Sequence, residues 1–498
     1  MDNKYILVID EGTTGTRAVI FNRKAKIVAS AYEEFTQYTP APDRVEHDAL
    51  EIWDKTVKMI KQALEKAGLE AEDIAAIGIT NQRATTVVWD RHTGQPICPA
   101  IVWQDTRTAK TCAEINATEW GEKARLSTGW TVAPVYSSLM LQWIFENVPG
   151  AREKAEQGDL LFGTIDTWLI WKLTGGRTHA ISYSNASVTG SLDLESLTWN
   201  QEWLNYLGVP LNIFPEPRDD SGDYGVTDGD LLGAEIPILG AIADQHAALF
   251  AQGCMEPGTV KCTHGTGTFL DMNIGPNPTV SNYGLNSIIA WRIKGKTTYG
   301  LEGYASVTGA AVQWLRDGAE LIQNSKETEA LALSVPSSDG VYFVPALAGL
   351  DSPFWDAFAR GTIIGITRGT KRAHLVRATL EAIVYRTRDF LDAMRKDSGV
   401  DIKSVKVDGG AAANNFLLQF QADILNCEVE RPLSVEATSL GAAFMAGLAA
   451  GYWQSEEELL QLREVDRVFY PQMAEEERER LYAQWLEAVK RSAGWAKV

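Results

Sequence analysis

Residues 5–21 set two apolar segments, rich in β-branched side chains, on either side of a short turn of glycine and threonine. This pattern predicts two strands joined by a tight hairpin. Because glycine tolerates positive φ, the N–H groups of such a turn can converge on an anion, and threonine hydroxyls and an arginine add donors. The residues predicted to hold this anion are Gly12, Thr13, Thr14 and Arg17. Asp10 ends the first strand and is placed to bind a hydrated Mg²⁺, although an ordinary core hairpin is the alternative.

Residues 260–274 repeat this plan in the second half of the chain, with a strand, a turn and another strand. The residues of this turn predicted to hold phosphate are Gly265, Thr266 and Gly267. Two such hairpins at corresponding places predict a duplicated domain with a nucleotide bound between the copies. The chain has no GxxxxGKS/T segment and no GxGxxG segment after a strand, so ATP would bind by another route.

The length and charge of the chain limit the classes of protein to which it can belong. A chain of 498 residues is too long for one core and is typical of two or more domains. The net charge of −19 would repel nucleic acid and anionic membranes, so we expect neither as a partner. Simple solubility is the more economical interpretation of this acidity.

Five cysteines at scattered positions predict neither a disulfide framework nor a zinc site. We expect them to be buried thiols in a reducing compartment. The sequence shows no signal-peptide pattern and no apolar segment of membrane-spanning length, so it predicts a cytoplasmic protein.

Strands alternate with helices in both halves, which predicts an α/β protein with domains at residues 1–250 and 251–498. We expect strands near residues 4–10, 16–22, 26–34, 74–80 and 85–90 in the first half, and 258–263, 267–274, 286–292, 297–302 and 404–408 in the second. We expect helices from Asp48 to Gly68, at 306–324, at 372–396, from Asn414 toward Leu425, and at 474–494.

Further segments carry a resemblance that covers the chain from Tyr5 to about Trp495. They are residues 77–83, 101–104, 167–172, 243–245, 313–317, 355–356, 361–381 and 407–410. With both hairpins, they make the chain similar to the FGGY family of sugar kinases, and within it to the glycerol kinases. This resemblance implies two actin-like, ribonuclease-H-like domains with an ATP cleft between them. It also implies Mg²⁺ as a cofactor, a small polyol or sugar as substrate, and a homo-oligomer, either a dimer or a tetramer.

The resemblance also implies roles for individual residues. Asp244 would be the base that accepts a proton from the substrate hydroxyl, although a helix N-cap is a structural alternative. The residues implied to contact the acceptor are Arg83, Trp103, Asp244, Gln245 and Phe269. The residues implied to line the adenosine pocket are Gly309, Gln313, Gly410 and Asn414.

Two positions of the implied acceptor site depart from the glycerol kinases. Those proteins carry Glu where this chain has Ala84, and Tyr where it has Val135. The exchange removes two polar groups and predicts a larger, less polar acceptor pocket. Asp105 could supply a replacement carboxylate, and we weigh that role equally with a structural one. For His246 and His264 we favour the structural role.

Three functions therefore compete. The first is a kinase that phosphorylates a terminal hydroxyl of glycerol or a related small polyol. The second is a kinase for a larger four- or five-carbon polyol or sugar, such as a tetritol or pentitol. The third is a non-catalytic, actin-like nucleotide-binding regulator. The presence of Arg83, Trp103 and Asp244 argues against the third, because a regulator has no need of an acceptor site.

Overall fold

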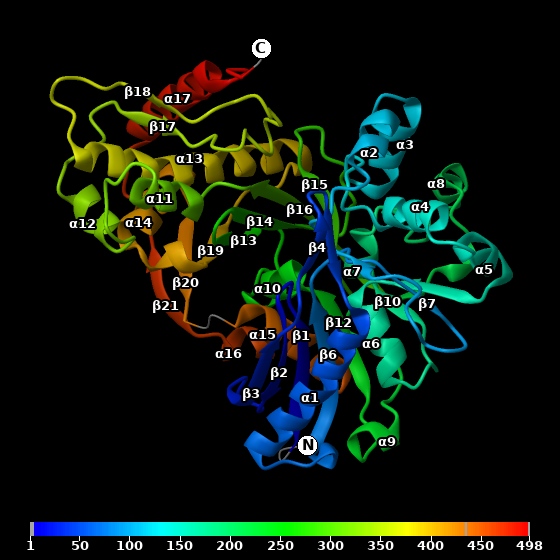
Figure 1. The fold of residues 1–498 in the computed structure, drawn as a ribbon. Helices are drawn as coiled ribbons and strands as arrows, with labels where there is room; N and C mark the ends of the chain where they lie inside the picture. Colours follow the sequence, from blue (N-terminus) through cyan, green and yellow to red (C-terminus); the bar gives the residue numbers. More distant parts are fainter. Residues whose placement is uncertain (1–3, 434–435, 497–498) are drawn as a thin grey trace.

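The computed structural model describes residues 4–433 and 436–496, and two large β-sheets organise it (Figure 1). The first sheet has the order β12-β6-β1-β2-β3 and the second has the order β15-β16-β14-β13-β19-β20-β21. The strands of the first sheet are β1 (Tyr5–Glu11), β2 (Gly15–Phe21), β3 (Ile27–Glu34), β6 (Ile74–Asn81) and β12 (Ile238–Ala243). Those of the second are β13 (Thr259–His264), β14 (Thr268–Gly275), β15 (Asn286–Ile293), β16 (Lys296–Ala305), β19 (Ser404–Asp408), β20 (Glu428–Pro432) and β21 (Val465–Phe469).

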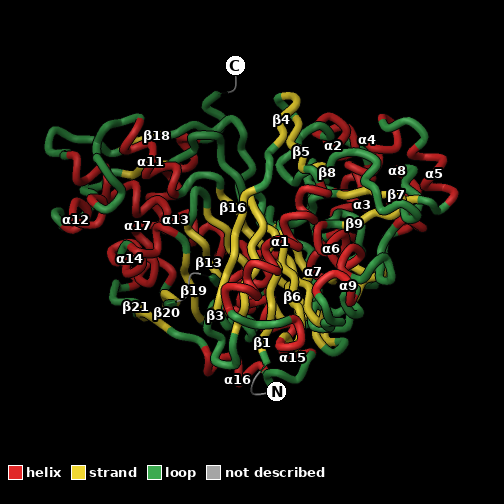
Figure 2. Tube along the Cα trace, turned by 60° about the horizontal axis from the view of Figure 1, so that its bottom comes forward, coloured by secondary structure: helices red, strands yellow, loops and turns green. Residues whose placement is uncertain are grey.

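Helices surround the two sheets, and the strands gather in the middle of the molecule (Figure 2). The helices of the first half are α1 (Ala49–Ala67), α2 (Ala109–Asn116), α3 (Glu119–Thr128), α4 (Ser137–Asn147), α5 (Ala151–Gln157), α6 (Ile165–Leu173), α7 (Tyr183–Ser187), α8 (Gln201–Leu207), α9 (Gly229–Leu232) and α10 (Asp244–Ala251). Those of the second half are α11 (Gly309–Asp317), α12 (Glu327–Leu333), α13 (Arg372–Ser398), α14 (Asn415–Leu425), α15 (Ala437–Ala449), α16 (Glu456–Leu462) and α17 (Glu475–Ser492). Small sheets pair β4 (Tyr38–Ala41), β5 (Arg44–His47) and β8 (Ala100–Ile101), β7 (Val87–Asp90) with β9 (Leu160–Gly163), β10 (Ala180–Ser182) with β11 (Glu216–Arg218), and β17 (Tyr342–Val344) with β18 (Thr362–Ile364).

The two large sheets repeat one plan. In the first, β2 lies antiparallel to β1 and β3, while β6 lies parallel to β1 and β12. In the second, β14 lies antiparallel to β13 and β16, while β19 lies parallel to β13 and β20. The strand order therefore confirms the duplication predicted from the two hairpins. It also confirms the predicted α/β class.

Helix α15 ties the second half of the chain to the first sheet. It packs against β1, β6 and β12 and against α10. Small residues make this contact possible: a Cβ on Gly240 would lie 3.0 Å from the Ala446 Cα and closer still to its nitrogen, and Gly441 stands against the backbone of Ala247. The second half therefore contributes side chains to the first sheet beside the first hairpin.

The expected helices form with one correction. Helix α11 ends at Asp317 rather than near residue 324, and Gly318 follows it with its N–H bonded to the Trp314 carbonyl. Helix α1 begins and ends as predicted: Asp48 accepts hydrogen bonds from two N–H groups of the first turn, and Gly68 ends it at φ 65°.

No helix within residues 4–433 or 436–496 has both the length and the apolar character needed to cross a membrane.

Candidate active site

The two hairpin turns are built alike. The Gly12 N–H donates to the Gly15 carbonyl at 3.1 Å, and the Gly265 N–H donates to the Gly267 carbonyl at 2.9 Å. Thr266 accepts backbone hydrogen bonds from residues 308 and 310, which attaches the second turn to the start of α11. Both predicted hairpin turns are thus confirmed, each between antiparallel strands, and their binding of phosphate stays a prediction.

Two of the four turn glycines, Gly15 and Gly267, allow close approach of neighbouring backbone, and none of the four is needed for positive φ. None of the four turn glycines has a positive φ. A Cβ on Gly15 would lie 2.8 Å from the Glu33 carbonyl oxygen, and one on Gly267 would overlap the Ala305 carbonyl. Neighbouring backbone passes so near that a larger residue cannot fit. The expectation of positive φ at Gly12 and Gly15 is therefore corrected.

Asp10 stands at the end of β1 and accepts a hydrogen bond from the Ser439 hydroxyl of α15 at 2.5 Å. Burial raises the pKa of Asp10 to about 6, although the Ser439 bond and Arg17 oppose this shift. The nearby Asp244 carboxylate raises the pKa further, so two carboxylates sense each other at this point.

Arg17, on β2, forms an ion pair with Glu436, which directly precedes α15. Its guanidinium also lies 5.5 Å from the ring centroid of Tyr32. A cation is therefore held beside Asp10, where outer phosphates would need neutralising.

Asp244 is the first residue of α10, and Ala243 holds the N-cap position. Asp244 is therefore not the N-cap of this helix, because Ala243 occupies that position. One carboxylate oxygen of Asp244 accepts the Gln245 N–H at 2.6 Å and lies 3.6 Å from the Arg83 Nε. Burial raises the pKa of Asp244, while Arg83 opposes the rise, so the carboxylate becomes a better proton acceptor than a free aspartate.

Residues of the second sheet complete this polar cluster, and the sequence reasoning missed them. Glu302 Oε2 lies 2.6 Å from Arg83 Nη1, and Lys261 donates to the Gln245 side chain and pairs with Asp271 at 3.0 Å. The available signal was a charged residue in the middle of each of three apolar strands.

The predicted acceptor residues lie in several environments. Trp103 is 38 % exposed, and its Nε1 donates to the Thr13 hydroxyl at 3.1 Å, which links the acceptor residues to the first phosphate turn. Phe269 stands on β14 with its ring centroid 4.6 Å from that of Tyr304. The residues predicted to contact the acceptor therefore come from both halves of the chain.

Ala84 is fully buried at a positive φ of 59°, and its carbonyl accepts hydrogen bonds from Thr86 and Ser137. Val135 is half-buried. The absence of a Glu side chain at position 84 therefore leaves no open space beside Ala84. Space left by the missing Tyr side chain would have to lie beside Val135.

Asp105 is 1 % exposed, and Arg107 and the Val45 N–H occupy both of its oxygens. The structure thus places this carboxylate in a buried ion pair with its own neighbours. His264 is also buried and bonds Thr268 and Gln421, and burial lowers its pKa to about 4. His246 is buried, and neither of its ring nitrogens has a partner among the described residues.

A cavity of about 710 Å³ adjoins the second hairpin, a volume in the range of small-molecule sites. The residues that line it include all four predicted for the adenosine pocket, Gly309, Gln313, Gly410 and Asn414. Of the three predicted for the second phosphate turn, Gly265 and Thr266 line it and Gly267 does not. The sequence reasoning did not find the contributions of α12 and of the segment before it, which include Ser325, Lys326 and Thr328. These residues precede or begin a short helix without a recognisable motif.

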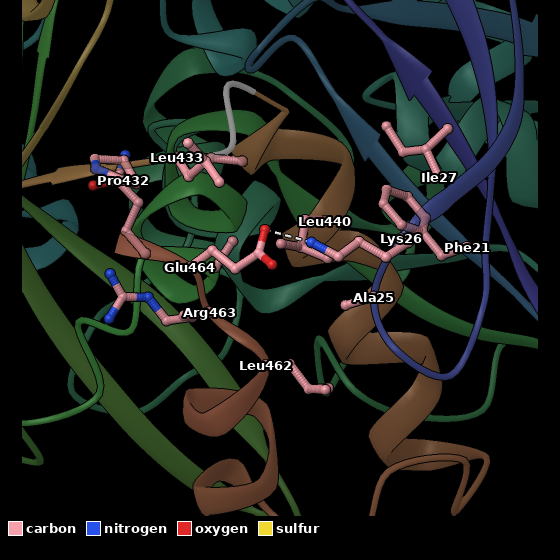
Figure 3. Close-up of a pocket in the computed structure, with 13 residues that line it drawn as sticks. Phe21, Ala25, Lys26, Ile27, Pro432, Leu433, Leu440, Leu462, Arg463 and Glu464 are labelled. Atoms are coloured by element: carbon pink, nitrogen blue, oxygen red, sulfur yellow. Dashed lines mark hydrogen bonds and ion pairs between the residues drawn. The ribbon is translucent and has the colours of Figure 1, made fainter. Parts of the chain in front are cut away.

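A smaller cavity of about 260 Å³ lies away from these residues, between the β2–β3 hairpin and residues 462–464 (Figure 3). The ion pair between Lys26 and Glu464 joins its two walls. None of the predicted site residues lines it, and it is not part of the candidate active site.

Comparison with known proteins gives one result along the whole chain. The sequence pattern of the FGGY family of carbohydrate kinases, N-terminal domain, matches residues 5–251, and that of the C-terminal domain matches residues 260–450. Glycerol kinase 2 of Thermotoga maritima is 53 % identical over 494 residues, which are 99 % of this chain and 100 % of that protein. Glycerol kinase of Caldanaerobacter subterraneus is 52 % identical over 99 % of each chain. The crystal structure of Plasmodium falciparum glycerol kinase with ADP superposes with a TM-score of 0.94 at 32 % identity, covering 98 % of each chain.

Proposed function

The chain belongs to the FGGY family of carbohydrate kinases, and we propose that it transfers the γ-phosphate of ATP to a terminal hydroxyl of glycerol or a related small polyol. The observation that carries this proposal is the Asp244–Arg83 pair at the start of α10, close enough to Asp10 for the two carboxylates to interact. A base, a cation and phosphate turns gathered in one place are the parts that phosphoryl transfer needs.

In this proposal Asp244 accepts the proton of the acceptor hydroxyl as that oxygen forms a bond to the γ-phosphorus. The bond between the γ-phosphorus and the oxygen bridging to the β-phosphate breaks, and ADP leaves. Arg17 and the N–H groups of the two turns neutralise the negative charge of the transferred group. The cavity beside α11 would hold the adenosine.

The residues around Asp10 fit Mg²⁺. Magnesium is bound in such kinases by one or two carboxylates together with phosphate oxygens and water, rather than by a cage of protein ligands. Asp10 offers one carboxylate near Asp244, and the described residues contain no group of three or more metal-ligating side chains. The ion would supply charge neutralisation at the phosphates, and Asp10 would hold it there.

A larger polyol is the second candidate substrate, and the specific observation in its favour is Val135. This position is half-buried, and valine has a smaller side chain than the tyrosine that glycerol kinases carry there. Ala84 supports this candidate less, because its methyl group is already covered by protein. Extra carbons would therefore extend toward Val135.

A coupled assay of ADP release over polyols of three to six carbons tests both candidates. We expect kcat/KM to be highest for glycerol or for a four- or five-carbon polyol. Asp244→Asn should lower kcat by about 10²- to 10⁴-fold with little change in nucleotide affinity. A protein that phosphorylates none of these acceptors would instead be the non-catalytic regulator, and near-normal turnover by Asp244→Asn would remove Asp244 from the role of base.

We further propose a cytoplasmic location and assembly as a dimer or tetramer. All five cysteines are free and four of them are buried, which suits a reducing compartment. Analytical ultracentrifugation of the full chain measures the assembly state directly.

A further inference from the structure

Three buried charged side chains form a row across the second sheet. Lys261 on β13 pairs in register with Asp271 on β14, and Asp271 pairs in register with Glu302 on β16. Residues directly opposite each other on adjacent strands project to the same face of a sheet. Each of the three is no more than 3 % exposed, and we refer to them as the charged row.

The charged row reaches residues of the first half that would contact the acceptor. Glu302 pairs with Arg83 at 2.6 Å, and Lys261 donates to the side-chain oxygen of Gln245. By contrast, the Arg83 guanidinium comes only within 3.6 Å of Asp244. The side chains of Arg83 and Gln245 are thus held more closely by residues of the second sheet than by the Asp244 carboxylate.

Stability alone does not explain such a row. Removing charges from water is costly, and well-packed apolar residues often stabilise a fold as much as a buried ion pair does. One carboxylate oxygen of Asp271 is buried with no partner among the described residues, so the row is not fully satisfied. What a buried ion pair does supply is a fixed direction for a long side chain.

We propose that Glu302 is a positioning residue that directs Arg83 toward the acceptor, and that Lys261 does the same for Gln245. This inference rests on the proposed function. Without Glu302, the one carboxylate still within 4 Å of the Arg83 guanidinium among the described residues would be that of Asp244. It would turn toward the base and away from the acceptor, so acceptor binding would weaken while the adenosine cavity remained unchanged.

Glu302→Gln tests the inference because it removes the charge at nearly constant shape. We expect the KM of the polyol that wild type phosphorylates best to rise about 10- to 100-fold, the range for loss of a hydrogen bond between charged groups. The KM of ATP should stay within about twofold of wild type. Glu302→Asp keeps the charge with a shorter reach and should restore part of the acceptor affinity.

Glu430→Gln is the matched control. Glu430 is also a buried strand glutamate with two cationic partners, Lys406 and Arg463, but it contacts none of the acceptor residues. It should leave the acceptor KM unchanged. An equal rise of the acceptor KM in both variants would overturn the positioning role and indicate general damage to the sheet.

A double-mutant cycle shows whether Glu302 acts through Arg83. In an Arg83→Gln background, adding Glu302→Gln should change the acceptor KM no further, and independent, multiplicative effects would overturn the inference. If Glu302→Gln does not fold, Glu302→Asp still decides, since an unchanged acceptor KM there would also overturn it. If the wild-type protein phosphorylates no polyol, the proposed function is refuted. If the wild-type protein is active and Glu302→Gln leaves the acceptor KM unchanged, only this inference is refuted.

Discussion

Glu11 carries a buried carboxyl group directly beside the first hairpin turn, and the described side chains that bond to it, Thr16 and Thr56, are uncharged. It has no exposed surface, and its two oxygens accept hydrogen bonds from the hydroxyls of Thr16 at 2.8 Å and Thr56 at 2.6 Å. Burial raises the pKa of Glu11 to about 8, and these two hydroxyls oppose the rise. Replacing it by Gln should therefore stabilise the protein at alkaline pH.

The hydrogen bonds around Glu11 allow an uncharged replacement. The amide oxygen of a Gln can accept from Thr16, and its NH₂ group can donate to Thr56. The Thr56 hydroxyl then donates to the Ile52 carbonyl, from which it already lies at 2.8 Å. Glu11→Gln would thus keep a hydrogen bond to each of the two threonines.

The size of the effect follows from proton binding. Because the pKa is higher in the folded chain, folded Glu11 binds more protons than unfolded Glu11 between pH 4.5 and about 8. The free energy of unfolding that Glu11 contributes is fully present below pH 4.5 and is lost as the pH rises to about 8. The pKa of Glu11 rises from 4.5 in the unfolded chain to about 8 in the folded chain. Since one pH unit corresponds to about 1.36 kcal/mol, the free energy of unfolding changes by at most about 5 kcal/mol over this range.

Thermal unfolding from pH 4.5 to 8.5, with EDTA present, measures the difference in Tm between Glu11→Gln and wild type. That difference should grow in favour of Gln with rising pH, by roughly 1–2 °C for each kcal/mol in a chain of this size. Glu33→Gln is the control, because the hydrogen bond from Lys58 lowers the pKa of Glu33, whereas burial raises that of Glu11. A Tm difference for Glu11→Gln that stays constant with pH would refute the reasoning.

Two further predictions concern the site. Arg17→Ala should raise the KM of ATP and slow phosphoryl transfer by tenfold or more, because it removes the cation beside the first phosphate turn. Steady-state kinetics measure both quantities, and an unchanged rate and KM would place Arg17 outside the site. Ala84→Glu with Val135→Tyr should shift the ratio of kcat/KM values for glycerol and a five-carbon polyol toward glycerol by at least about tenfold. Most of that shift should come from Val135→Tyr alone, because Ala84 is already covered, and a wild type that strongly prefers glycerol would contradict the pocket argument.

Sequence patterns predicted helices and strands well where the interactions that form them join residues close in the sequence. The β1–β2 and β13–β14 hairpins and the helices expected to begin at Asp48 and Asn414 all form as the sequence indicates. The end of α11 was wrong, because apolar spacing continues past Gly318 although the helix does not. Periodicity describes a buried face and does not report where the backbone turns away.

The site was predictable only in part, because its geometry depends on long-range pairing. The four residues predicted for the adenosine pocket came from a family resemblance, and the structure places all four in the lining of one cavity. No local pattern places Glu302 opposite Arg83, since 219 positions separate them and only the strand register aligns Glu302 with Asp271. Likewise, Ser439 reaches Asp10 only because α15 crosses to the first sheet.

The second half of the chain therefore contributes to the site in two different ways. Ser439 and Glu436 stand at the start of α15, which is packed on the first sheet, so their contacts with Asp10 and Arg17 belong to that sheet. Glu302, by contrast, stands on the second sheet, so its contact with Arg83 spans the two sheets. A rotation of one sheet against the other would leave the first phosphate turn intact and disconnect the acceptor side chains. Acceptor affinity should then depend on how the halves are arranged, and a bound acceptor should in turn stabilise that arrangement, since a ligand stabilises the state that binds it.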